Sequence, residues 1–302
     1  MKKNKALAVP FVLWAILFIA VPLVMVVWYG VTVEETPAYV EVEGIDGQTM
    51  FQLEDGTLTA ERPEKQTVVS LANFKRMLEP TYLKLLLRSL KIALFTTILC
   101  LLLGYPVALI LSGKDFKRPG LWLMLIILPM WMNFLLRTLA WQTLLEKAGV
   151  INSILSFFHL PSLNIINTPS AIVLGMVYNF LPFMVLPIYN VLVKIDPNVL
   201  NAARDLGASE LQTFLRVTFP LSLPGVISGV TMVFVPALTT FVISNLLGGS
   251  KILLIGNVIE QEFTQAGNWH LGSGLSIVLM IFIIINMMAT SIFDKEGEGQ
   301  TL

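Results

Sequence analysis

Long apolar runs alternate with short polar segments along most of this chain of 302 residues. Six runs are long enough to cross a bilayer, because a spanning helix needs roughly 20 mostly apolar residues. They cover residues 6–30, 92–113, 120–145, 170–193, 221–247 and 272–293, and Arg137 carries the one formal charge inside them. The pattern predicts an all-α integral membrane protein with six transmembrane helices.

Composition supports this interpretation, since 55% of the residues are apolar and only 13% are charged. Twenty basic residues balance twenty acidic ones, so net charge does not indicate a nucleic-acid partner. The single cysteine, Cys100, excludes a disulfide within the chain. Neither His159 nor His270 has a Cys, Asp or Glu at metal-ligand spacing, and no nucleotide-binding glycine loop occurs. We therefore expect neither an enzyme nor a bound metal or cofactor.

The first run follows Lys2, Lys3 and Lys5, as the apolar part of a signal peptide does. Its 25 uncharged residues exceed the usual length of that part, and no small-x-small cleavage site follows. We interpret the run as a retained transmembrane helix.

The distribution of basic residues orients the runs, because short cytoplasmic loops carry an excess of Lys and Arg. One set of alternate polar segments holds ten of them: Lys2, Lys3, Lys5, Lys114, Lys117, Arg118, Lys194, Arg204, Arg216 and Lys295. The short segments on the opposite side hold Lys147 and Lys251. The chain is therefore predicted to lie in the cell membrane, with both termini on the cytoplasmic side.

The first loop, residues 31–84, is the one sizeable soluble segment. Alternating apolar and polar residues around the turn dipeptides Asp46-Gly47 and Asp55-Gly56 predict a small antiparallel, β-hairpin-like sheet of two or three strands. An amphipathic helix is expected from the spacing of Leu71, Phe74, Met77 and Leu78. Residues 31–80 hold ten acidic and four basic residues, a net charge of −6. This loop is either a solvated cap or an acidic surface that attracts a cationic solute.

Residues 194–220, here the coupling segment, contain signals for two short helices. Asp196 followed by Pro197 predicts a capped helix start, and Gly207 can adopt the left-handed conformation that ends a helix. Ser209 and Gln212 have the spacing of a capping box, which starts a second helix. A passive linker needs neither cap, so a helix, a glycine elbow and a second helix on the cytoplasmic side indicate a docking element.

The coupling segment resembles the signature Glu-Ala-Ala-x3-Gly-x9-Ile-x-Leu-Pro of the membrane subunits of binding-protein-dependent ABC importers. Asn201-Ala202-Ala203, Gly207 and Val217-Thr218-Phe219-Pro220 match it at identical spacing, with Asn201 in place of the family's Glu. Residues 89–112, 135–155, 177–209, 246–263 and 268–280 are similar to the permeases of spermidine/putrescine importers, specifically to the first of their two permease subunits. The insertion at about 36–66 departs from that family, whose first loop is shorter.

The resemblance implies a MetI-like ABC type I importer fold and a set of partners. A second permease would complete a heterodimer, two ATPase subunits would grip the coupling segment and bind ATP and Mg, and an extracytoplasmic binding protein would deliver the polyamine. The expected parts are a cytoplasmic N-terminus and first span (1–30), an extracytoplasmic insertion (31–84), the permease core (85–293) and a cytoplasmic tail (294–302). ATPase coupling would involve Asn201, Ala202, Ala203, Asp205, Gly207, Val217 and Pro220.

Residues on the solute path are chosen by their chemistry, because a cation in a membrane favours aromatic faces and carbonyl oxygens. The candidates are Trp131, Asn133, Trp141, Tyr178, Asn179 and Phe183. Ordinary packing or an interfacial aromatic belt is the alternative role for them. Arg137 would repel a polyamine from the path, so a helix break or a subunit interface is the expected position for it.

Three other functions stay open. An ion-coupled secondary transporter usually has buried carboxylates and repeated halves, neither of which is evident in this sequence. A membrane enzyme would need a cluster of His, Asp, Glu or Cys near the interface, and none is evident in this sequence. An ABC permease for another small solute, such as ferric iron, a sulfonate or an opine-like compound, is the nearest alternative.

Overall fold

The computed structural model of the chain describes residues 5–43, 49–53, 58–59, 65–113, 116–249 and 251–298. The chain divides into two compact units. One is drawn from Met1–Leu83 and Ile259–Met280, and the other from Lys84–Val258 and Ile281–Leu302. Each unit is built mainly from helices, as the hydropathy pattern predicts.

The first unit starts with a helix that changes type along its length. α1 (Lys5–Ala15) continues into a π-helical turn, η1 (Ile16–Ala20), and then into α2 (Val21–Gly30). Its part from Val9 to Gly30 is long and apolar enough to cross a membrane. The same unit holds α3 (Ala72–Met77), most of α13 (Ile255–Thr264) and the first part of α14 (Trp269–Glu298). α3 confirms the short helix expected around Phe74 and Met77.

The small antiparallel sheet of two or three strands that the sequence predicts is present in the first unit, and the described residues also form a second, two-stranded sheet. Within the described ranges, β1 (Thr32–Glu35) pairs with β5 (Gln66–Val69), and β2 (Tyr39–Glu43), β3 (Thr49–Leu53) and β4 (Leu58–Thr59) form a sheet in that order. Opposite partners include Thr32 with Val69 and Tyr39 with Leu53. Both predicted turn dipeptides, Asp46-Gly47 and Asp55-Gly56, lie outside the described residues.

The second unit contains the long helices of the core. α4 (Pro80–Ser112), α8 (Pro169–Leu192) and a continuous helix over Glu210–Thr239 are each long and apolar enough to cross a membrane. The last of these consists of α10 (Glu210–Thr213), a π-helical turn η3 (Phe214–Thr218) and α11 (Phe219–Thr239). Shorter elements connect them: α5 (Pro119–Ile127), η2 (Leu128–Trp131), α6 (Phe134–Leu145), α7 (Val150–Phe157), α9 (Pro197–Asp205) and α12 (Val242–Leu247).

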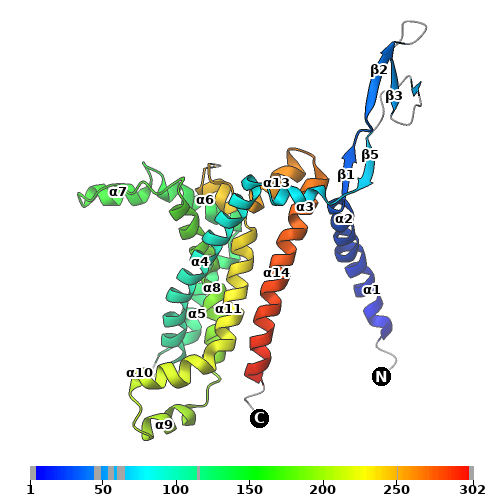
Figure 1. Cartoon of the computed structure of the whole chain (residues 1–302). Coiled ribbons are helices and arrows are strands. Elements are labelled where there is room, and N and C mark those ends of the chain that lie inside the picture. The colour runs from blue at the N-terminus through cyan, green and yellow to red at the C-terminus, as the bar shows by residue number, and fades with distance from the viewer. Residues whose placement is uncertain are drawn as a thin grey trace. The chain divides into compact units, whose positions relative to one another are not determined.

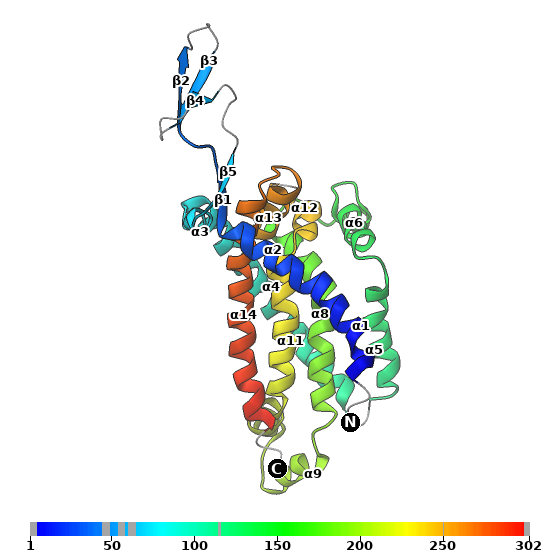
Figure 2. The same ribbon diagram turned by 90° about the vertical axis from the view of Figure 1, so that its right-hand side faces the viewer.

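α8 and α11 form the centre of the second unit. α9 lies at one end of this unit and α6 at the other (Figure 1), and Figure 2 shows α8 and α11 running side by side between those ends. Glycines allow the close approach, since a Cβ added at Gly229 would lie 2.8 Å from Met184 Sδ, and one at Gly225 would lie 2.8 Å from the Pro187 carbonyl oxygen. Small residues at such contacts are typical of helices that associate in membranes.

The third apolar run, residues 120–145, is not the single helix that its hydropathy predicts. Residues Pro119–Trp131 and Phe134–Phe157 meet at a bend of 94°. Met132 is extended, and the Asn133 side chain accepts hydrogen bonds from the backbone N–H groups of Leu135 and Leu136 at 2.9 and 3.2 Å. An N-cap of this kind starts a new helix. The polar Asn133 inside the run was the signal for the break.

The fifth run, residues 221–247, is also divided. α11 ends at Thr239, Thr240 takes an extended conformation, and α12 starts at Val242. Toward the N-terminus the helix starts eleven residues before the predicted run, at Glu210 rather than Leu221. Consequently the second helix of the coupling segment and the fifth span are one continuous helix.

Candidate functional site

The coupling segment begins with the capped helix that the sequence predicts. The Asp196 side chain accepts a hydrogen bond from the Asn198 N–H at 2.9 Å, and Pro197 occupies the first turn of α9. The carboxylate satisfies an N–H group that would otherwise have no partner in the helix, and it favourably meets the positive end of the helix dipole. Interactions between neighbouring residues therefore determine where α9 starts.

Gly207 forms the elbow, with φ of +84°. The Gly207 N–H donates to the Arg204 carbonyl at 2.8 Å and the Ala208 N–H donates to the Ala203 carbonyl at 3.1 Å, which ends α9. A Cβ at Gly207 would meet no atom within 4 Å, so glycine is favoured by its backbone conformation rather than by space.

The second helix starts with a complete capping box. Ser209 Oγ accepts from the Gln212 N–H at 3.3 Å, and Gln212 Oε1 accepts from the Ser209 N–H at 2.9 Å. Across the elbow, Arg204 and Glu210 form an ion pair at 3.1 Å, which is largely exposed. Exposed pairs of this kind contribute about 0–1 kcal/mol. The caps and Gly207 therefore determine the elbow more than this ion pair does.

A π-helical turn connects the elbow to α11, and an aromatic cluster holds it against α4. The ring of Tyr105 lies 5.8 Å from that of Phe214 and 5.7 Å from that of Phe219, measured between centroids. Its hydroxyl lies 2.7 Å from Ser222 Oγ, and Ser222 donates to the Phe219 carbonyl. Tyr105 must then donate to Ser222. Single π-helical turns inside α-helices occur frequently at functional sites.

A pocket of about 660 Å³ lies behind the elbow, between the end of α4, the start of α9 and the α10–η3 helix. Asn201, Arg204 and Glu210 line it, together with Thr213, whose buried hydroxyl has no hydrogen-bond partner in the part of the chain that the structure describes.

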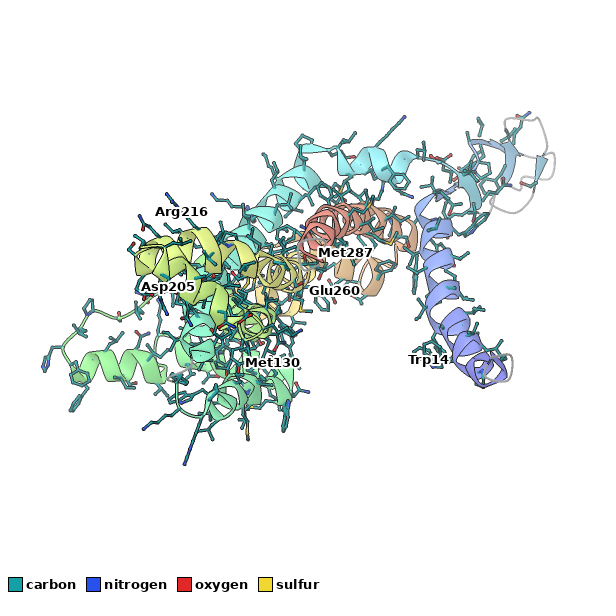
Figure 3. The ribbon with its side chains drawn as sticks, turned by 90° about the horizontal axis from the view of Figure 1, so that it is seen from below. Trp14, Met130, Asp205, Arg216, Glu260 and Met287 are labelled. Carbon is teal, nitrogen blue, oxygen red and sulfur yellow. The ribbon has the colours of Figure 1, made fainter. Side chains whose placement is uncertain are left out.

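The predicted coupling residues lie on both sides of the elbow. Ala202 is exposed and Ala203 half-buried on α9, while Val217 is half-buried on η3 and Pro220 is exposed at the start of α11. Seen from this end of the chain, Figure 3 places Asp205 on α9 and Arg216 on η3, and both residues are exposed. Small side chains therefore face outward between charged ones on this surface.

Arg137 lies just beyond the break in the third run, as expected for a charge at a helix break. Its Nη1 donates to the Pro129 carbonyl at 2.7 Å, and its guanidinium lies 6.0 Å from the Phe134 ring and 5.7 Å from the Tyr178 ring. Only 7% of Arg137 is exposed. This cation therefore joins both sides of the bend to α8.

The six candidates for the solute path do not form one pocket. Trp141 and Tyr178 meet edge to face at 5.1 Å, beside Arg137. Trp131 is 82% exposed, and Asn133 is engaged as a helix cap. Asn179 is buried and donates to the Gly175 carbonyl of its own helix, while Phe183 is half-buried farther along α8. The role of these residues stays a prediction.

The sequence did not predict the buried hydrogen-bond network around the side-chain amide of Asn257. Asn257 Oδ1 accepts from Ser244 Oγ and from the Leu254 N–H at 2.6 and 2.9 Å. Its Nδ2 donates to the Phe241 carbonyl and to Asn245 Oδ1 at 3.1 and 2.6 Å. All of the hydrogen-bonding capacity of this amide is thus used on the irregular backbone after α11. In the sequence, the only sign of this network is that the polar Asn257 follows a run of apolar residues.

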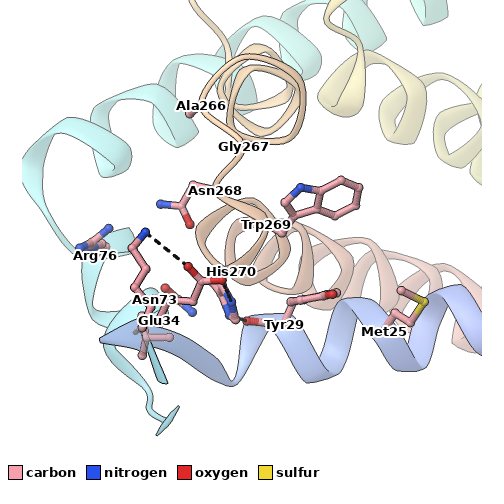
Figure 4. A pocket seen from close by; sticks show the side chains of 12 residues that line it. Met25, Tyr29, Glu34, Asn73, Arg76, Ala266, Gly267, Asn268, Trp269 and His270 are labelled. Carbon is pink, nitrogen blue, oxygen red and sulfur yellow. Dashed lines mark hydrogen bonds and ion pairs between the residues drawn. The ribbon is translucent and has the colours of Figure 1, made fainter. Parts of the chain in front are cut away.

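The first unit has a pocket of its own, of about 520 Å³, at the base of the β1–β5 sheet (Figure 4). His270 Nδ1 lies 2.8 Å from the Thr32 carbonyl and 3.2 Å from the Tyr29 carbonyl, so Nδ1 carries a proton and donates. The Asn73 amide donates to the Thr32 carbonyl at 2.9 Å. Glu34 lies 3.7 Å from His270 Nε2 and 3.5 Å from Lys65 Nζ. His270 and Asn73 thus bind the backbone carbonyls where α2 turns into β1.

Residues 93–295, which include the elbow and both divided spans, match the family described as binding-protein-dependent transport system inner membrane component. The chain belongs to this family. It is therefore a multi-pass inner-membrane permease, a transport component of an ABC importer.

Curated relatives resemble the chain over most of its length. The spermidine/putrescine transport system permease protein PotB of Escherichia coli K12 is 42% identical over 237 residues, which cover 76% of this chain and 86% of the relative. PotB of Salmonella typhimurium SL1344 is 35% identical over 301 residues, covering 98% of this chain and 96% of the relative. The E. coli permease protein YdcU is 30% identical over 253 residues, covering 79% of each chain.

Solved structures share the fold. A chain of a bacterial ABC transporter that imports the acidic polysaccharide alginate has a TM-score of 0.69 at 15% identity, covering 98% of this chain and 96% of that one. A chain of the methionine transporter MetNI has a TM-score of 0.52 at 16% identity, covering 72% and 98%. The MetI-like importer fold with a small β insertion in its first loop is therefore confirmed.

Proposed function

We propose that this chain is a permease subunit of an ATP-driven importer of polyamines such as spermidine and putrescine. The observation that carries the proposal is the similarity to PotB of Salmonella, which extends over 98% of the chain and so includes the coupling segment and the spans. The proposed location is the cytoplasmic membrane, with both termini in the cytoplasm.

The coupling segment is proposed to receive the motion of two ATPase subunits, which would bind ATP and Mg. Because α10, η3 and α11 are continuous, a displacement of the elbow would reach the fifth span without passing through a loop. Through Tyr105 the same displacement would reach α4. Coupling free energies between such sites are typically about 1–3 kcal/mol. No cofactor is proposed for this chain itself.

Two more partners are proposed. A second permease would complete the path as a heterodimer, and an extracytoplasmic binding protein would deliver the solute. In support, one of the alginate importer structures contains a periplasmic protein with bound alginate pentasaccharide, although that protein and its solute belong to that transporter. The six apolar runs contain no Asp or Glu that could hold a cation, so selectivity for the polyamine is assigned mainly to the binding protein.

Uptake of radiolabelled spermidine and putrescine, by cells that produce this chain with its partner subunits, tests the proposal. We expect ATP-dependent accumulation that is lost when this chain is omitted. Accumulation of ferric iron, a sulfonate or an opine instead would overturn the substrate assignment but leave the permease in place. Transport by this chain alone, driven by an ion gradient, would overturn both the ATPase partnership and the coupling role.

A further inference from the structure

α7 is a short amphipathic helix with an uncovered apolar face. Val150, Ile154 and Phe157 lie three and four residues apart, so they share one side of the helix, and Phe158 extends this side beyond its end. Phe157 is 78% exposed and Phe158 65%. With Ala148 and Ser153 these residues line a shallow hollow of about 450 Å³. Ser156 lies on the opposite side of the helix.

The position of α7 along the chain limits how far it lies from the bilayer. It follows α6 after four residues, and α8, a membrane-spanning helix, starts at Pro169. Figure 1 shows α7 projecting sideways from the end of the bundle where α6 lies, across the direction of α8. The segment is thus tethered at one end to α6, which belongs to a bent apolar helix pair, and at the other end to α8, which is long and apolar enough to cross a membrane.

Asn152 holds this segment in a compact form. Its amide donates to the carbonyls of Glu146 and Leu163, both at 3.0 Å, and its Oδ1 accepts from the Leu163 N–H at 2.7 Å. Asn152 is 5% exposed, so these bonds are shielded from water. They join α7 both to the end of α6 and to the chain beyond α7.

The chemistry of the apolar face fits a lipid surface. Residues 150–158 contain no charged side chain, and the exposed side consists of two phenylalanines, two branched aliphatic residues and the small Ser153. Interfacial helices bury such a face at the boundary between headgroups and acyl chains. Soluble interfacial helices add cationic residues for attachment, whereas here the neighbouring spans already supply attachment.

We infer that α7 is an interfacial anchor whose Val150, Ile154, Phe157 and Phe158 side chains insert into the bilayer surface at the end of α6. The anchor would fix the depth of α6, which carries Trp141, relative to the bilayer surface. It requires only that the chain is a membrane protein, so it is independent of the solute.

Spin-label accessibility in the assembled transporter, reconstituted in nanodiscs of phosphatidylcholine and phosphatidylglycerol, tests the inference. Cys100 is the only cysteine of the sequence, so Cys100→Ala provides a clean background. Labels are placed at Phe157→Cys on the apolar face and at Ser156→Cys on the opposite face. Leu102→Cys, exposed on α4, is the lipid reference, and Gln66→Cys, exposed on β5 and outside the coupling segment, is the water reference.

We expect the label at residue 157 to collide with oxygen more often than with a water-soluble nickel chelate, as at residue 102. The label at 156 should show a smaller ratio of oxygen to nickel collisions. Nickel collisions at 157 equal to those at 66 would overturn the anchor by placing this face in water. Low collision rates with both reagents would overturn it by showing that a protein partner covers the face. Ile154→Cys reports on the same face if the variant at 157 does not assemble.

Discussion

The hydroxyl of Tyr105 on α4 donates to Ser222 Oγ on α11 at 2.7 Å, beside the π-helical turn that joins the elbow to the fifth span. Ser222 directs its own proton to the Phe219 carbonyl. Tyr105 is 7% exposed and its ring touches those of Phe214 and Phe219. One side chain of α4 thus contacts both the π-helical turn and the fifth span.

Removing the hydroxyl and removing the ring of Tyr105 should have different effects. Tyr105→Phe loses one hydrogen bond, about 0.5–1.5 kcal/mol, and should retain solute uptake. Tyr105→Ala loses the aromatic contacts as well, about 3–5 kcal/mol. For Tyr105→Ala we expect a lower melting temperature and more ATP hydrolysed per solute imported, measured in proteoliposomes. An unchanged ATP-to-solute ratio in a stably assembled Tyr105→Ala complex would contradict the role of Tyr105 in transmitting the motion of the elbow to α4.

Gly207→Pro should leave membrane insertion intact but abolish solute-stimulated ATP hydrolysis, because proline cannot adopt the positive φ of the elbow. Ala203→Asp should have the same effect by placing a bulky charge on the docking face. Gly207→Asn is the matched control, since asparagine tolerates the left-handed conformation. Normal hydrolysis and uptake by the proline variant would refute the docking role of the elbow.

Asn201→Glu restores the residue that the family signature has at this position. Asn201 is exposed on α9, three residues before Arg204, so a glutamate can pair with that arginine for about 0.2–0.5 kcal/mol. Solute-stimulated ATP hydrolysis should be equal to or higher than that of the unaltered complex. Asn201→Ala provides the comparison without the carboxylate. A strong loss of solute-stimulated ATP hydrolysis in Asn201→Glu, but not in Asn201→Ala, would mean that the elbow is adapted to a neutral residue.

Arg137→Lys should destabilise the complex although the charge is kept. Lysine lacks the planar group that lies over Phe134 and Tyr178, and such contacts contribute about 0.5–2 kcal/mol. A lower melting temperature of the purified complex is the expected result, measured by tryptophan fluorescence. Lys147→Arg, on the exposed residue between α6 and α7, should leave the melting temperature unchanged. Equal melting temperatures for both variants would contradict the role of Arg137 at the bend.

Sequence alone determined the features of this protein that depend on neighbouring residues. The apolar runs located the spans, because hydrocarbon excludes polar side chains. The Asp196 cap, the Ser209 capping box and the Gly207 elbow form within a few residues, so their spacing in the chain is enough to predict them.

Tertiary structure decided where the runs bend and what holds the bends. The break before Asn133 is fixed by Arg137, which reaches back to Pro129 and across to Tyr178. The π-helical turn is packed on Tyr105, which is separated from Ser222 by 117 residues in the sequence. Hydropathy averages over a window and records no partner, so it merges broken helices into single runs. Contacts between distant residues arise only when packed helices bring the two side chains together.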